Sequence, residues 1–270
     1  MMKLNVLPAR AGAQWVKLGL RTFFRQPLAL GALFVLFLII ISLAALIPLA
    51  GIVISPTLVP ALTVGLMAAT HEAENGKTPL PTVLFAAFRR DAARTRAMIG
   101  LGLMFAAASL VVIGISMSID GGRFLSLISA PPEHLNTLTL NPRLLLAMLV
   151  TLALYLPVSI AFWHAPALVY WHGVAPVKSL FFSFVAVLKN TRSFLLYGLL
   201  WMGLSLGVSM TLAILALSAG NLALVTLVSL PVSLLLGALF FTSVWFTFRD
   251  SFTADTPPPD DLPPESQSAP

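Results

Sequence analysis

The sequence has no cysteine and few charged residues. Without cysteine the chain can form no disulfide, no thiolate metal site and no cysteine nucleophile. Only 10% of its 270 residues are Asp, Glu, Lys or Arg, whereas a soluble domain has roughly 25%. Hydrophobic residues make up 58%, and the mean hydropathy is +0.95. This balance excludes an ordinary soluble domain and predicts an all-α, polytopic membrane protein.

Sequence motifs of the common enzyme classes are also missing. We find no His-Glu-x-x-His, no Gly-x-Ser-x-Gly, no phosphate-binding glycine loop and no pair of carboxylates within an apolar run. We therefore predict a non-enzymatic protein with no cofactor. The net charge is +6, but the charges fall between apolar runs and not on one soluble face, so nucleic acid is not a predicted partner.

Six apolar runs are long enough to cross a bilayer. About 20 helical residues at 1.5 Å each span a hydrocarbon core of about 30 Å. The predicted spans are 28–47, 52–70, 97–119, 144–170, 194–217 and 221–248. Prolines within the second, fourth and sixth runs predict kinks. With their connectors these spans form an integral membrane domain over 1–250, and the acidic, proline-rich segment 251–270 is predicted to be disordered.

The positive charges lie almost entirely on one side of the predicted spans. Of 16 Lys and Arg, only Arg123 and Arg143 fall in connectors on the side opposite the N-terminus, and the other 14 fall on the N-terminal side. Short cytoplasmic loops carry such an excess of Lys and Arg. We therefore expect a multi-pass bacterial inner-membrane protein with both termini in the cytoplasm.

Three basic connectors predict helices over 9–26, 81–96 and 176–192. In the first, basic side chains from Arg10 to Arg25 recur within an arc of roughly 80°, with Trp15 and Phe23 on the opposite side. Such a helix lies in the headgroup plane, with its rings in the acyl boundary and its cations on anionic lipid. The alternative is a charged flank that only sets topology. The predicted contacts with anionic phospholipid are Arg10, Lys17, Arg21, Arg25, Arg89, Arg90, Arg94, Arg96, Lys178, Lys189 and Arg192.

A basic segment followed by two spans occurs three times, over 9–70, 81–170 and 176–248. This layout predicts an internal repeat, as in many membrane folds. The alternative is that hairpins with positive inner flanks look alike without common origin.

The stretch 155–178 is chemically unusual. His164 is the one ionisable side chain well inside an apolar run, and such groups are functional candidates by default. Proline removes a helix hydrogen bond and frees a carbonyl nearby. The candidate functional residues are Trp163, His164, Pro166, Pro157, Trp171 and His172. The alternative is an aromatic belt with two neutral interfacial histidines.

No metal site is predicted there. His164 and His172 are eight residues apart, about 12 Å along a helix. That separation is too large for two ligands of one ion, and no third ligand is evident.

Two further features have open interpretations. Arg249 and Asp250 follow the last span directly, and they clamp the basic connectors, dock a neighbour or form a solvated interfacial anchor. Gly203 and Gly207 have the spacing that permits close helix approach.

Three stretches carry a resemblance to a known family. They are FWHAPALVYWHGVAPVKSLFFS, with its Trp-His-Ala-Pro and Trp-His-Gly motifs, WVKLGLRTFFRQPLALGALF, and FFTSVWFTFRDSF, with Phe-Arg-Asp-Ser-Phe. The chain resembles a family of bacterial multi-pass inner-membrane proteins over about residues 1–252. The resemblance implies an inner-membrane location and assigns no catalytic residue.

Three functional hypotheses follow. The first is a non-enzymatic protein whose basic face engages anionic lipid, or a partner protein, in envelope organisation or assembly. The second is a transporter or channel for a small neutral or apolar solute, using the proline-broken helices around His164. The third is an enzyme acting on lipid with His164 or His172 as acid or base.

Overall fold

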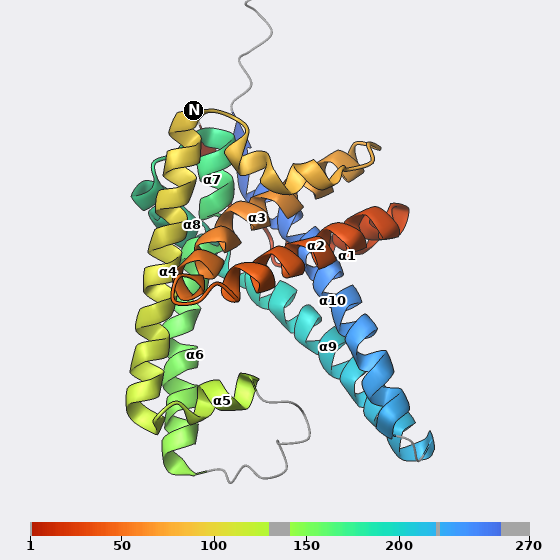
Figure 1. Ribbon diagram of the computed structural model, residues 1–270. Helices are drawn as coiled ribbons and strands as arrows, with labels where there is room; N and C mark the ends of the chain where they lie inside the picture. Colours follow the sequence, from red (N-terminus) through yellow and green to blue (C-terminus); the bar gives the residue numbers. More distant parts are fainter. Residues whose placement is uncertain (1, 130–140, 220–221, 255–270) are drawn as a thin grey trace, which may run out of the picture.

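The computed structural model describes residues 2–129, 141–219 and 222–254 (Figure 1). This part of the chain is mostly helical, which confirms the all-α prediction. The elements in chain order are β1 Met2–Leu4, α1 Ala11–Arg25, α2 Pro27–Ala45, α3 Gly51–Glu74, the 3-10 helix η1 Pro81–Phe88, α4 Ala92–Asp120, α5 Arg123–Ser129, α6 Pro142–Trp163, α7 Ala165–His172, α8 Pro176–Lys189, α9 Thr191–Ala219, α10 Leu222–Ser251 and β2 Phe252–Ala254.

Six helical segments are long and apolar enough to cross a membrane, as predicted. They are Pro27–Ala45, Gly51–Glu74, Ala92–Asp120, Pro142–His172, Thr191–Leu215 and Leu227–Ser251. Their bounds differ from the predicted ones by a few residues, because polar residues at several helix ends still belong to the helix. Helices α3 and α10 continue through their internal prolines.

The helices form two arms joined by a crossing hairpin (Figure 1). Helices α4 and α6 pack together on one side, and α9 and α10 pack together on the other. The α2–α3 hairpin crosses between them, with its turn beside α4 and α6 (Figure 1). A Cβ on Gly102 of α4 would lie 2.1 Å from the carbonyl oxygen of Thr57 in α3. This crossing therefore requires glycine at position 102.

Both ends of the described chain lie together. Strands β1 and β2 pair antiparallel, with Met2 opposite Ala254 and Leu4 opposite Phe252. The prediction of a disordered tail from 251 is therefore wrong at its start, because this segment finds backbone partners in the N-terminal strand. The rest of the predicted tail, 255–270, lies outside the described residues.

The second basic connector is not one helix over 81–96, contrary to our prediction. Helix η1 ends at Phe88, and α4 begins at Ala92. Asp91 has an extended backbone, and its side chain accepts a 2.7 Å hydrogen bond from the Arg94 amide. This N-cap starts a new helix that continues into the third span, so Arg94 lies on the first turns of that span.

The predicted fourth span over 144–170 is two helices that meet at His164. Helix α6 ends at Trp163, and α7 begins at Ala165. Pro166 has no amide hydrogen, so the helix hydrogen bond to the Phe162 carbonyl cannot form across this junction. Pro157, by contrast, lies within the continuous α6.

Helix α1 forms as predicted, but its apolar side packs inside the protein. Trp15 is fully buried, with its ring centroid 5.1 Å from that of Phe194 in α9, and Phe23 is also buried. A Cβ on Gly19 would lie 2.5 Å from the Cβ of Ser243 in α10. The expectation that these rings enter the acyl boundary is therefore wrong, since α9 and α10 cover them.

Candidate functional site

His164 lies at the junction of α6 and α7 and is completely buried. Its ring is packed among the rings of Phe194, Phe248 and Phe252, with centroid distances of 5.7, 6.0 and 5.4 Å. Its Nε2 lies 3.2 Å from the Thr247 hydroxyl oxygen of α10. A side chain with no accessible surface touches no space that a solute could enter. The catalytic and transport roles considered for His164 stay predictions, and this packing does not favour them.

A serine from α8 enters the helix junction. The His164 amide donates to Ser183 Oγ at 2.9 Å, and Ser183 Oγ donates to the Ile160 carbonyl at 2.9 Å. In a continuous helix the amide of residue 164 would bond directly to that carbonyl. The hydroxyl therefore replaces one helix hydrogen bond and holds α6, α7 and α8 together. No sequence pattern pointed to this serine.

The other residues of the 155–178 stretch do not converge on one site. The Trp163 indole donates to the Thr247 hydroxyl at 3.1 Å, so it belongs with His164. The ring of Trp171 packs 5.0 Å from that of Trp245. His172 instead lines a surface cavity of about 410 Å³ with Arg94 and Asp91. The candidates are thus divided between an interior cluster and a separate surface.

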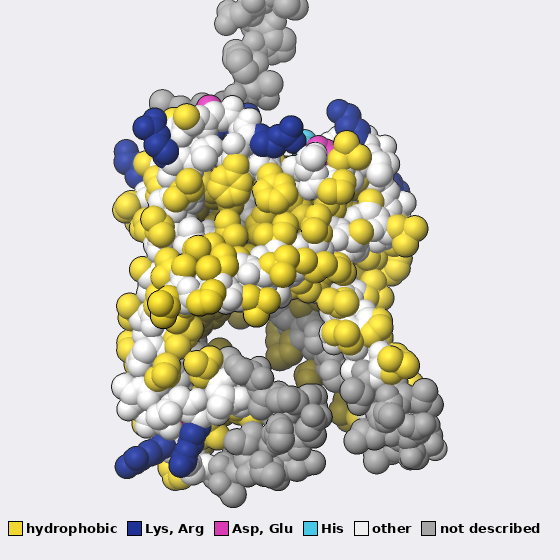
Figure 2. Space-filling model, in the orientation of Figure 1, with side chains coloured by type: hydrophobic (Ala, Val, Ile, Leu, Met, Phe, Trp, Pro, Cys, Tyr) yellow, Lys and Arg dark blue, Asp and Glu magenta, His cyan; other side chains and the backbone are white. Residues whose placement is uncertain are grey.

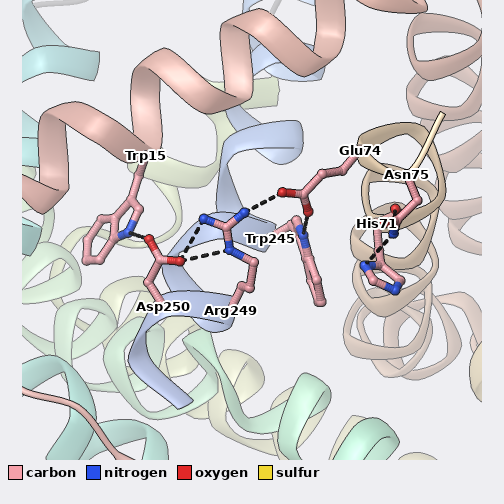
Figure 3. Close-up of polar contacts among 7 residues, drawn as sticks. All are labelled: Trp15, His71, Glu74, Asn75, Trp245, Arg249 and Asp250. Carbon is pink, nitrogen blue, oxygen red and sulfur yellow. Dashed lines mark hydrogen bonds and ion pairs between the residues drawn. The ribbon is translucent and has the colours of Figure 1, made fainter. Parts of the chain in front are cut away.

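A polar network joins helices α1, α3 and α10 (Figure 3). Arg249 forms an ion pair with Glu74 of α3, and its Nε donates to Asp250 at 2.8 Å. The Trp15 indole of α1 donates to Asp250 at 3.0 Å, and the Trp245 indole donates to Glu74 at 2.8 Å. Each carboxylate is thus shared between Arg249 and one indole. Among the interpretations of Arg249 and Asp250, the structure shows the clamp, because the pair binds Glu74 and Trp15 in two of the predicted connectors.

The sequence alone did not identify Glu74, Trp15 or Trp245 as members of this network. An indole N–H and a carboxylate make a charge-assisted hydrogen bond when they meet inside a protein. The one visible signal was that Glu74 and Asp250 both lie within four residues of the end of a predicted span, at the same predicted membrane side.

The predicted basic residues lie at the surface. Among Arg10, Lys17, Arg21, Arg25, Arg89, Arg90, Arg94, Arg96, Lys178, Lys189 and Arg192, all are exposed except Arg94, which is half-buried. Figure 2 shows Lys and Arg side chains along the upper rim of the molecule, separated by an apolar band from a smaller group at the opposite end. The charges thus bracket a belt of hydrophobic surface, as expected of a chain that spans a bilayer.

A second polar cavity opens among the basic connectors. Its volume is about 480 Å³, and its charged lining residues are Lys77, Arg89, Arg90 and Glu72. The Arg90 guanidinium lies 5.1 Å from the ring centroid of Tyr170 and donates to the Tyr170 carbonyl at 3.3 Å. This contact fixes Arg90 against α7 and leaves Lys77 and Arg89 exposed at the rim. The cavity offers cations to an anionic group.

Nearly the whole chain is similar to a known bacterial protein. A relative from Burkholderia thailandensis, named "Probable inner membrane protein", is 37% identical over 265 residues. The match covers 97% of this chain and 98% of the relative. The chain belongs to this family of inner-membrane proteins. No protein-family model matches the chain, and no solved structure matches it.

This membership confirms the resemblance found in the sequence. It places the six apolar helices in the inner membrane. The relative's name states no ligand, reaction or partner, so the roles of the network and of the basic surface must be argued from this structure.

Proposed function

We propose that this inner-membrane protein is non-enzymatic, keeps both termini in the cytoplasm, and binds anionic phospholipid through its basic face. The observation that carries the proposal is the division of α1 into two sides. The side that carries Trp15 and Phe23 is buried within the protein, whereas Arg10, which caps the helix, and Lys17, Arg21 and Arg25 within it are all exposed.

The exposed side of α1 is suited to lipid headgroups. None of these four cations forms an ion pair with another described residue, so their charge is available to a ligand. Each Lys or Arg near an anionic leaflet contributes about 1 kcal/mol of binding. The other side of α1 is anchored in the protein. The row of four basic side chains is therefore held in one orientation, and its backbone loses little conformational entropy when lipid binds.

The test compares lipid-dependent stabilisation of two charge variants. In one, Arg10, Lys17, Arg21 and Arg25 are all changed to Gln; in the matched control, Arg123 and Arg143 at the opposite end are changed to Gln. Thermal unfolding in detergent is followed with added phosphatidylglycerol or phosphatidylcholine. We expect phosphatidylglycerol to stabilise the wild type and the control, less so at high salt, but not the α1 variant. A wild-type response in the α1 variant would refute the proposal.

Orientation is tested separately. Since the chain has no cysteine, single cysteines can be introduced at Lys17 and Ser126. A membrane-impermeant maleimide added to spheroplasts should label only the Ser126→Cys protein. Labelling of Lys17→Cys under the same conditions would reverse the proposed topology.

A further inference from the structure

The polar cavity of about 480 Å³ among the basic connectors lies where two membrane-spanning segments end. Glu72 lines it from the last turn of α3, and Tyr170 lines it from the last turn of α7. Helix η1 and the turn before it supply most of the remaining wall. Because α3 and α7 both end segments long enough to cross the bilayer, their common end marks the level of the lipid headgroups.

Contacts within the protein fix the shape of this cavity. The Lys77 amide donates to the Glu72 carbonyl at 2.9 Å, and the Gln26 side-chain amide donates to the Lys77 carbonyl at 3.1 Å. A Cβ on Gly65 of α3 would lie 2.4 Å from the Leu84 carbonyl oxygen, so η1 packs directly on α3. A ligand that enters the cavity therefore has little backbone to order.

One part of the lining suits a phosphate group. Lys77 and Arg89 are exposed, and neither forms an ion pair with a described residue. Thr78 and Thr82 are also exposed, and their hydroxyls have no hydrogen-bond partner within the described chain. Arg90 adds a third positive charge from its fixed position against α7. Cationic and hydroxyl donors that a ligand can reach are what phosphate oxygens require.

Glu72 gives the lining one opposite charge. Its carboxylate is partly exposed and forms no ion pair with the three cations or with any other described residue. A simple anion in the cavity would leave this carboxylate unpaired and place a like charge near it. A phosphoethanolamine headgroup satisfies both parts of the lining, because its ammonium donates hydrogen bonds to a carboxylate. The quaternary ammonium of phosphocholine has no N–H to donate.

An apolar side chain at the same cavity favours a lipid over a soluble phosphate ester. Leu80 lines the cavity and is 65% exposed, and Phe85 in η1 is 43% exposed. Exposed apolar side chains beside cations suit a molecule that carries hydrocarbon beneath a charged headgroup. The level of the cavity, at the ends of α3 and α7, agrees with this occupant.

We propose that this cavity binds the headgroup of one ethanolamine phospholipid. Lys77 and Arg89 pair with its phosphate. The hydroxyls of Thr78 and Thr82 donate to the same phosphate oxygens, and the Glu72 carboxylate accepts from the ammonium. The inference rests on the proposed function only in that this end of the molecule meets phospholipid headgroups. The residues that carry it are not those of the α1 row, so either proposal can fail alone.

The test measures lipid binding to the purified, detergent-solubilised protein by native mass spectrometry, with one lipid titrated at a time. We expect one phosphatidylethanolamine to bind about tenfold more tightly than phosphatidylcholine, the value of one hydrogen bond to a charged group. Glu72→Gln should remove this preference and leave phosphatidylcholine binding unchanged. Equal binding of the two lipids by the wild type would overturn the proposal.

Charge variants test the phosphate contacts. Lys77→Gln with Arg89→Gln should weaken phosphatidylethanolamine binding about tenfold or more. Lys178→Gln with Arg192→Gln is the matched control, because it removes the same charge from exposed positions outside the cavity. Thr82→Trp fills the cavity without changing its charge and should abolish binding. Thermal unfolding checks that each variant folds. Wild-type binding in a folded Thr82→Trp protein, or equal effects of the two charge variants, would refute the site.

Two further arms separate this proposal from the neighbouring possibilities. The variant with all four α1 cations changed to Gln should bind phosphatidylethanolamine as the wild type does, and excess phosphatidylglycerol should not displace the lipid from it. Loss of binding in that variant, or displacement, would overturn the proposal. Water-soluble glycerophosphoethanolamine should compete poorly, because it lacks the hydrocarbon that Leu80 meets. Competition at the concentration of the lipid itself would overturn the assignment to lipid.

Discussion

Ser183 completes the helix hydrogen bond that is missing at His164. Its hydroxyl accepts from the His164 amide and donates to the Ile160 carbonyl, and it is fully buried. The break between α6 and α7 therefore leaves neither of these two backbone groups unsatisfied. It also ties α8 to the junction, although α8 follows it by more than ten residues in the chain.

Ser183→Ala should destabilise the protein by about 1–3 kcal/mol, because two buried backbone groups lose their partner at once. Ser179→Ala is the matched control. Ser179 is equally buried on the same helix, but its hydroxyl donates only to the nearby Pro176 carbonyl. We expect the control to cost less than half as much in reversible denaturation of the detergent-solubilised protein. Equal losses would show that the bridge contributes nothing specific.

The hydrogen bonds around Thr247 fix the tautomer of His164. Thr247 has one hydroxyl hydrogen, which it donates to the Val244 carbonyl at 2.7 Å. Its oxygen must then accept from both the Trp163 indole and His164 Nε2. We predict that nitrogen NMR of the labelled protein finds His164 neutral, with the proton on Nε2 and none on Nδ1. A proton on Nδ1 would contradict this arrangement.

Trp15→Phe should cost about 1–2 kcal/mol, because Asp250 loses a hydrogen bond to a charged oxygen while the ring packing largely remains. Trp171→Phe controls for the smaller ring, since no hydrogen bond of its indole N–H is found among the described residues. The difference between the two variants, measured by denaturation, isolates the bond to Asp250. If both variants lose the same stability, that bond carries no net energy.

Local patterns predicted the spans, because a run of apolar residues or a row of cations is visible in the sequence itself. The pairings that build the sites were not visible. Trp15 and Asp250 are 235 residues apart, and Trp245 and Glu74 are 171 apart. Nothing in one sequence marks such partners. The common origin of the three hairpin units stays a prediction, although a short helix, α1, η1 or α8, does precede each of them.

The close helix approach that the spacing of Gly203 and Gly207 permits does not occur within the described chain. A Cβ added at Gly203 or Gly207 would meet no atom within 4 Å, so α9 makes no close approach there within the described chain. Gly12 and Gly19 do make close approaches, and they lie two turns apart on the buried side of α1. Small residues on the apolar side of a short amphipathic helix indicate backbone contact, whereas the same residues on a span can simply face lipid.

Two glycine-to-alanine changes should therefore have opposite signs. Gly19→Ala places a methyl group 2.5 Å from the Ser243 Cβ and 2.7 Å from its Cα, so α1 and α10 must separate. We expect a loss of about 1–3 kcal/mol from this overpacking, although alanine itself favours a helix. Gly203→Ala meets nothing within 4 Å and should gain up to about 1 kcal/mol from helix propensity alone. Denaturation of both variants measures the two effects. A neutral Gly19→Ala would mean that α1 is not held against α10 in the way described, and the fixed orientation of its basic row would then lose its support.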